Sequence, residues 1–138
     1  MPADADVYRS PVRYFEMDTQ GVVFNMWYLG YVDEASAWFF DRLPAVRLRE
    51  LGMDVQLVHA EIDWAGSLRA GDTAHIGVFT ERVGTTSFTL RYEIRREVSV
   101  ESPPVAIARV VYVTVAADIT SGKRPVPDDL RAALLAAR

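Results

Sequence analysis

The chain has 138 residues, a formal net charge of -4 and no cysteine, and half of its residues are hydrophobic. An acidic chain does not suit nucleic acid, because binding to phosphates needs a basic face. The absence of cysteine excludes disulfides, thiolate metal sites and a cysteine nucleophile. The length predicts one domain over residues 1–138, large enough to bury a hydrophobic core.

The N-terminal ten residues have neither the basic region nor the apolar region of a secretory signal, which favours a cytoplasmic location. Only His59 and His75 supply imidazole, and neither has a partner at zinc-site spacing. We therefore expect no metal site, and we expect both histidines to be strand residues with local partners. Arginine pairs such as Arg95-Arg96 still leave room for a small anionic ligand.

The alternation of Val7 to Phe15 predicts a first strand. A loop with an acidic residue, Asp18, and a turn at Gly21 follows, and a helix is expected from about Asn25. This order places a carboxylate beside unpaired backbone N–H groups and the positive end of a helix dipole.

The helix is predicted by apolar residues at spacings of three and four, and Pro44 is expected to end it. These residues are Tyr28, Tyr31 or Val32, Ala35, Trp38 or Phe39, and Leu43. The polar strip opposite them is narrow, so the helix should be covered by other elements. It is too short and too charged to cross a bilayer.

Downstream of a helical turn that Gly52 should close, the apolar period changes to two and predicts four strands. They span residues 54–64, 73–83, 87–97 and 105–117, and a short helix follows over 128–138. The last strand is apolar on both faces, which is typical of a strand inside a sheet. Short connections require antiparallel pairing. The sequence thus predicts an α+β fold with a curved antiparallel β-sheet wrapped around one long central α-helix.

Residues 13–28 are similar to the Asp-x-x-Gly motif that precedes the central helix of the hotdog-fold thioesterases. The 4-hydroxybenzoyl-CoA thioesterase family is the branch they resemble. Further matches follow in the same order at residues 60–64, 68–72, 84–88 and 120–127, so that the resemblance covers nearly the whole chain. It implies a hotdog fold and the hydrolysis of an acyl-CoA to free CoA and a carboxylic acid, without a cofactor.

The resemblance assigns the catalytic carboxylate to Asp18, as nucleophile or general base, and the group that polarises the thioester carbonyl to the backbone amide of Asn25. Several relatives have His or Tyr at the position of Asn25, so a role for its side chain is not implied. The substrate-binding residues implied by the motif are Gly21, Val22, Val23, Phe24 and Tyr28. Candidates by position for the CoA phosphates are Arg82, Arg91 and Lys123.

Other interpretations remain open. An Asp in such a loop is ordinarily a cap or turn residue, and Glu34 on the helix is an alternative acid. Glu16 is expected to be structural or exposed. A non-catalytic module that binds acyl-CoA or an acyl-carrier thioester is the main alternative function. A dehydratase or hydratase is the weakest alternative, because no histidine lies in an Asp-His motif.

Exposed strand edges and the apolar surface of the helix predict self-association. The resemblance implies a homodimer or homotetramer, with the site between subunits. The acyl chain, the choice between CoA and a carrier protein, and the mode of attack by Asp18 stay open at this point.

Overall fold

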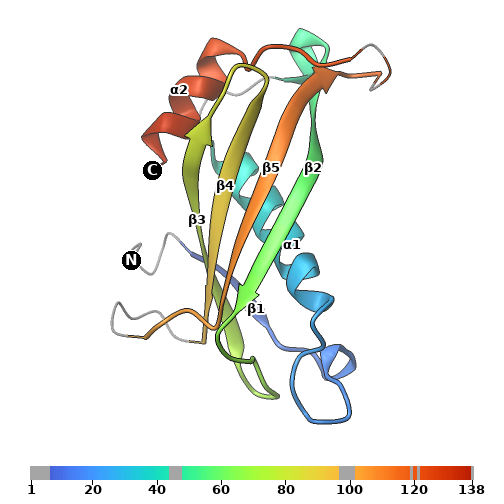
Figure 1. Cartoon of the computed structure of the whole chain (residues 1–138), viewed down its shortest axis with the longest axis vertical. Coiled ribbons are helices and arrows are strands. Elements are labelled where there is room, and N and C mark those ends of the chain that lie inside the picture. Colours follow the sequence, from blue (N-terminus) through green and yellow to red (C-terminus); the bar gives the residue numbers. More distant parts are fainter. Residues whose placement is uncertain (1–6, 44–47, 97–101, 119, 121, 138) are drawn as a thin grey trace. The chain divides into compact units, whose positions relative to one another are not determined.

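The structure is a computed structural model that describes residues 7–43, 48–96, 102–118, 120 and 122–137. Figure 1 labels its helices and strands, which follow in the order β1 (Val7–Pro11), α1 (Trp27–Arg42), β2 (Met53–Trp64), β3 (Thr73–Val83), β4 (Ser87–Arg95), β5 (Ala106–Ala116) and α2 (Asp128–Ala136). Two short 3-10 turns lie at Tyr14–Glu16 and Arg49–Leu51. No described helix is both long enough and apolar enough to span a membrane.

The five strands form one sheet in the order β1-β3-β4-β5-β2, and neighbouring arrows alternate in direction (Figure 1). β1 pairs antiparallel with β3, with Val7 opposite Gly77 and Pro11 opposite Thr73. The predicted interior position of β5 is confirmed, since β4 and β2 flank it. β2 lies at an edge and carries exposed apolar side chains at Leu57 and Val58.

One compact unit contains residues 1–41, 62–78 and 92–108. Within it, the buried face of α1 has the predicted spacing: Tyr28, Tyr31, Val32, Ala35 and Phe39 are buried. The rings of Tyr28 and Tyr31 meet edge to face with centroids 6.0 Å apart. Each large apolar side chain buried in this way contributes roughly 1.5–3 kcal/mol to folding, so packing holds this helix in place.

The second compact unit contains residues 42–61, 79–91 and 109–138. α2 buries Leu130, Ala133 and Leu134 there. The Arg131 guanidinium donates a hydrogen bond to the carbonyl oxygen of Gly84 at 2.7 Å, which ties α2 to the β3–β4 turn. β2, β3, β4 and β5 each have residues in both units.

The predicted first strand is too long, because the extended segment ends at Pro11 and the chain turns at Tyr14–Glu16. The Glu16 side chain accepts the backbone N–H of Arg13 at 2.7 Å, and this contact favours a turn over a continued strand. α1 ends at Arg42, while Pro44 lies outside the described residues. Gly52 has φ +68, a conformation that favours glycine, where the predicted closing turn falls.

The histidines differ from each other. His59 lies 3.8 Å from the Glu61 carboxylate on the exposed strand β2. The expectation of a local partner is wrong for the Nδ1 atom of His75 on β3, which is buried and has no hydrogen-bond partner among the described residues.

Candidate functional site

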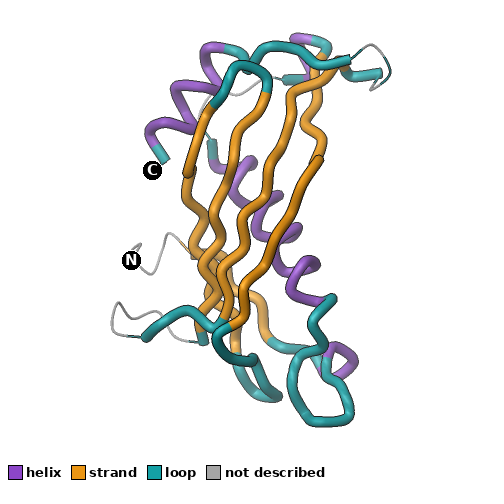
Figure 2. The backbone as a smooth tube through the Cα atoms, viewed as in Figure 1, coloured by secondary structure: helices purple, strands orange, loops and turns teal. Residues whose placement is uncertain are grey.

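The Asp18 loop, residues 17–25, is closed by backbone contacts between its two arms. Met17 and Val23 form an antiparallel bridge, and the Asp18 N–H donates to the Val22 carbonyl oxygen at 2.8 Å. Gly21 donates to the Asp18 carbonyl oxygen at 3.1 Å with φ +76. Other residues rarely adopt this left-handed conformation, so glycine allows the tight turn. Figure 2 shows the segment as loop between the 3-10 turn and α1.

The Asp18 carboxylate is half-buried, and its two oxygens have different surroundings. Oδ1 accepts the N–H of Gln20 at 2.8 Å and, at a longer 3.4 Å, that of Val22. This is an Asx turn, as expected for an aspartate that shapes a loop. Oδ2 has no hydrogen-bond partner in the described part of the chain. One oxygen therefore holds the turn while the other is available.

The loop leads directly into the start of α1. Trp27 and Tyr28 donate their N–H groups to the carbonyl oxygens of Phe24 and Asn25, at 2.9 and 3.3 Å. The Asn25 amide itself has no acceptor among the residues that the structure describes. No acidic residue occupies the first turn of α1. An unpaired amide at the positive end of a helix is suited to a developing negative charge.

Two of the predicted substrate-binding residues support the loop from within the core. Val23 and Tyr28 are buried. Val23 donates its N–H to the carbonyl oxygen of Leu68 at 2.9 Å, and the Tyr28 hydroxyl accepts the Leu68 N–H at the same distance. Burial raises the pKa of Tyr28, so its hydroxyl stays protonated at neutral pH. Val22 forms a bridge with Arg69 and is half-buried.

Large apolar side chains around this loop are exposed. Phe24, another predicted substrate-binding residue, is 46% exposed, and Tyr14 on the preceding 3-10 turn is 89% exposed. Phe15 and Trp27 meet edge to face with ring centroids 5.4 Å apart. The sequence interpretation missed Tyr14 and Phe15 because it placed them in a strand. Contiguous exposed apolar surface commonly marks a ligand or partner surface.

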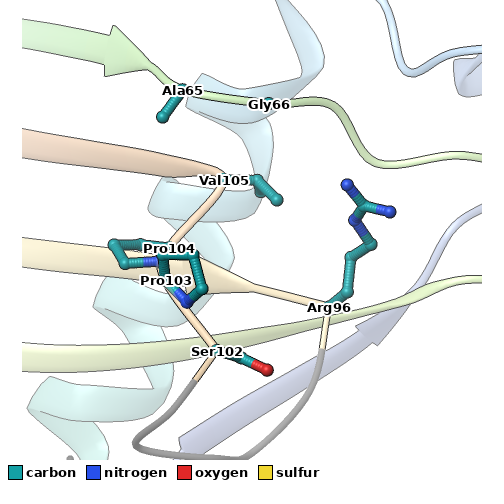
Figure 3. A pocket seen from close by; sticks show the side chains of 7 residues that line it. All are labelled: Ala65, Gly66, Arg96, Ser102, Pro103, Pro104 and Val105. Carbon is teal, nitrogen blue, oxygen red and sulfur yellow. The ribbon is translucent and has the colours of Figure 1, made fainter.

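A pocket of about 320 Å³ opens in the compact unit that also contains the Asp18 loop (Figure 3). Its lining residues are Ala65, Gly66, Arg96, Ser102, Pro103, Pro104 and Val105. The Arg96 side chain is exposed, and its guanidinium lies beside Gly66. A Cβ added to Gly66 would lie 3.8 Å from Nη2 of Arg96. Arg95, in contrast, is buried and pairs with Glu93 at 2.8 Å. Of the arginine pair noted in the sequence, Arg96 is therefore the one that is exposed and lines the pocket.

The predicted phosphate-binding residues Arg82, Arg91 and Lys123 belong to the second unit. The Arg91 guanidinium lies over the Phe79 ring, 4.9 Å from its centroid. The backbone of Lys123 pairs with Val115 in an isolated bridge. Their role in phosphate binding stays a prediction.

The alternative acid, Glu34, is exposed on α1 and accepts a hydrogen bond from the Tyr8 hydroxyl at 3.0 Å. Glu16, which the sequence predicts to be structural or exposed, is buried and accepts hydrogen bonds from the Arg13 backbone N–H and the Tyr31 hydroxyl. The described residues contain no group of three His, Asp or Glu side chains that could hold a metal ion.

Residues 12–134 match the family model of the thioesterase-like superfamily. A 1,4-dihydroxy-2-naphthoyl-CoA hydrolase from Nostoc punctiforme is 26% identical over 130 residues, which cover 89% of this chain and 82% of that protein. A 1,4-dihydroxy-2-naphthoyl-CoA thioesterase from Synechocystis has a similar structure, with TM-score 0.78, 23% identity and 94% of each chain covered. A mutant 4-hydroxybenzoyl CoA thioesterase complexed with 4-hydroxybenzoyl CoA gives TM-score 0.81 at 17% identity, covering 93% of this chain and 96% of that one. The predicted hotdog fold is confirmed.

Proposed function

The chain belongs to the thioesterase-like superfamily, and on that premise we propose that it is an acyl-CoA thioesterase with Asp18 and the Asn25 backbone amide at its catalytic centre. One observation carries the proposal. A carboxylate with one unpaired oxygen lies in a tight loop that leads into α1, and the backbone amide of Asn25, two residues before α1, also has no partner among the described residues. These are the two groups that thioester hydrolysis requires.

The chemistry needs no metal, because a thioester carbonyl is electrophilic. Asp18 Oδ2 either attacks the carbonyl carbon or removes a proton from the water that attacks it. The Asn25 N–H donates to the carbonyl oxygen as it becomes negative, and removal of one such donor costs roughly 100- to 1,000-fold in rate. In the first case the C–S bond breaks to leave a mixed anhydride on Asp18, which water then hydrolyses to the carboxylic acid and free Asp18. In the second case water adds to the carbonyl carbon and the C–S bond breaks to give the carboxylic acid directly. In both cases the thiolate of CoA takes up a proton.

The surroundings suit an acyl-CoA. Exposed aromatic side chains at Tyr14, Phe15 and Phe24 offer contacts for an apolar acyl group. Arg96 adds a fourth candidate to Arg82, Arg91 and Lys123 for the CoA phosphates, and it lies in the same unit as Asp18. The named relatives act on aromatic acyl-CoA thioesters, so we include aryl and aliphatic substrates in the test.

We also propose that the chain forms a homodimer, which can pair again into a tetramer. β2 is an edge strand of twelve residues with exposed apolar side chains at Leu57, Val58 and Trp64. A long apolar edge offers unpaired backbone groups to a second strand. Light scattering coupled to gel filtration measures the oligomeric state.

The deciding experiment measures the release of free thiol from a panel of aryl and aliphatic acyl-CoAs by the unaltered protein and by Asp18→Asn. Asparagine keeps an Oδ1 acceptor for the Gln20 N–H and thus keeps the Asx turn, while the charge is removed. The matched control is Asp118→Asn, because Asp118 Oδ1 accepts the Thr120 N–H at 3.1 Å in a similar turn of the second unit. We expect kcat to fall at least 100-fold in Asp18→Asn and to stay unchanged in the control.

Binding without turnover supports the alternative of a non-catalytic acyl-CoA module, which would also explain Asp18 as a turn residue alone. Calorimetric titration with a non-hydrolysable acyl-CoA thioether separates this case from a protein that does not bind. Full activity in Asp18→Asn would show that the charge of Asp18 has no catalytic role.

A further inference from the structure

A buried carboxylate lies two residues before Asp18. Glu16 is 2% exposed at the end of the 3-10 turn Tyr14–Glu16. Its Oε1 accepts the Arg13 backbone N–H at 2.7 Å and the Tyr31 hydroxyl at 2.9 Å, and its Oε2 lies 3.3 Å from Arg13 Nη1. A buried glutamate is rare unless it is paired in this way.

The contact with Tyr31 is not explained by capping of the turn. Capping of the turn requires only the hydrogen bond from the Arg13 N–H to Glu16. Tyr31 lies 15 residues after Glu16, in the second turn of α1. Burial and the hydrogen bond to Glu16 raise the pKa of Tyr31, so its hydroxyl remains a donor at neutral pH. The side chain of Glu16 thus joins the 3-10 turn to the helix.

The backbone of Glu16 makes a second connection, because its carbonyl oxygen accepts the Phe24 N–H at 2.9 Å. Asp18 follows Glu16 by two residues, and Asn25 follows Phe24 by one. One residue therefore fixes both ends of the Asp18 loop and links them to α1. A shift of Glu16 moves the carboxylate and the amide on which the proposed reaction depends.

We infer that Glu16 is a positioning residue. It acts through Tyr31 to hold the Asp18 carboxylate and the Asn25 amide in the positions that the reaction requires. This inference rests on the proposed function. Glu16 touches no reacting atom, and its effect is on geometry. Misplacement of a reacting group by about 1 Å can cost about 100-fold in rate, so a small movement of this loop is enough to be measured.

Three substitutions remove different contacts of the Glu16 side chain. Tyr31→Phe removes only the link to α1 and leaves the Arg13 contacts. Glu16→Gln keeps an oxygen for the Arg13 N–H and the Tyr31 hydroxyl, but it places an NH2 group against Arg13 Nη1. Glu16→Ala removes all three contacts. We expect kcat to fall about tenfold or less in Glu16→Gln, about tenfold in Tyr31→Phe and about 100-fold in Glu16→Ala.

The expected pattern is a loss in kcat with little change in KM, since substrate contacts are kept while the reacting groups are misplaced. In the double variant Glu16→Ala with Tyr31→Phe, the second substitution should cost nothing further, because the two residues act through one contact. Additive losses would overturn the link through Tyr31.

Two controls separate positioning from a general loss of stability. Tyr8→Phe removes a hydroxyl that donates to Glu34, a carboxylate on α1, and should keep kcat. Ile76→Val removes one buried methyl group from β3, and its effect on kcat shows what destabilisation alone does. If the kcat loss in the Glu16 variants is no larger than in Ile76→Val at equal loss of thermal stability, Glu16 is merely structural and the inference fails.

Amide hydrogen exchange gives a readout that does not depend on activity. We expect Glu16→Ala and Tyr31→Phe to speed exchange at the Phe24 amide, whereas Tyr8→Phe leaves it unchanged. If Asp18→Asn abolishes turnover while the Glu16 and Tyr31 variants keep full kcat, this inference alone is overturned. If the unaltered protein hydrolyses no acyl-CoA, the proposed function fails, and the positioning role fails with it.

Discussion

The turn at Gly21 allows a test in which strain and chemistry are separated. Gly21 has φ +76, and a Cβ added there would meet no atom within 4 Å. Gly21→Ala therefore introduces no clash, and its cost comes from the backbone alone. A left-handed conformation costs an L-residue roughly 1–2 kcal/mol. Alanine also lowers the conformational entropy of the unfolded chain, which offsets about 0.4–1 kcal/mol of this cost. We expect a net loss of about 1 kcal/mol in the free energy of unfolding.

Gly52 provides the matched control. It has φ +68, an added Cβ would again meet nothing within 4 Å, and it lies between the second 3-10 turn and β2 in the second unit. Gly52→Ala should therefore lose the same stability, about 1 kcal/mol. If the Asp18 loop holds the catalytic groups, only Gly21→Ala should lose activity, by about 100-fold in kcat if the strained loop shifts by about 1 Å.

Urea unfolding of both variants gives the stability, and thiol release from the preferred acyl-CoA gives kcat. Gly21→Asn should recover part of the activity, because asparagine tolerates the left-handed conformation better than alanine does. Equal kcat in Gly21→Ala and Gly52→Ala, at equal loss of stability, would refute a catalytic role for this loop.

The remaining predictions concern other groups. Burial and the hydrogen bond to Glu16 raise the pKa of Tyr31, so the folded protein holds the hydroxyl proton more tightly than the unfolded chain does. The contribution of Tyr31 to the free energy of unfolding is therefore complete below about pH 10, the pKa of tyrosine in the unfolded chain, and declines above it. Urea unfolding from pH 8 to 11 should show this decline in the unaltered protein and a shallower one in Tyr31→Phe. Arg96→Gln should raise KM for acyl-CoA about tenfold, equal to about 1.4 kcal/mol, with kcat unchanged. If only Arg82→Gln raises KM, the CoA phosphates bind in the second unit and not at Arg96. Leu57→Lys should convert dimers to monomers in light scattering, because a charge on an edge strand opposes pairing, and an unchanged mass would place the subunit contact elsewhere.

Most of the fold could be predicted from the sequence because its elements follow local rules. β3 spans Thr73–Val83 as predicted, since apolar alternation ends at Gly84. The buried face of α1 follows the spacing of Tyr28, Val32 and Ala35. Periodicity depends on neighbours within one element, and the printed sequence contains all of that information.

The missed features depend on contacts between distant residues. The turn at Tyr14–Glu16 is stabilised by the bond from Tyr31, 15 residues away, so that alternation alone favours a continued strand. The pocket that Arg96 lines is formed with Val105, whose carbonyl oxygen accepts the N–H groups of Ala65 and Gly66. Neither contact leaves a local pattern in the sequence.

The interpretation of Asp18 as a turn residue and its interpretation as a catalytic group are compatible. The turn uses Oδ1, which the Gln20 N–H holds at 2.8 Å, and this contact restricts the rotation of the carboxylate. The other oxygen has no partner among the described residues, so it need not break a bond before it reacts. A carboxylate fixed by one oxygen has already lost much of the rotational freedom that an approaching thioester would otherwise have to restrict. The Asx turn, which on its own argues for an ordinary loop, thus becomes part of the preorganisation of the proposed site.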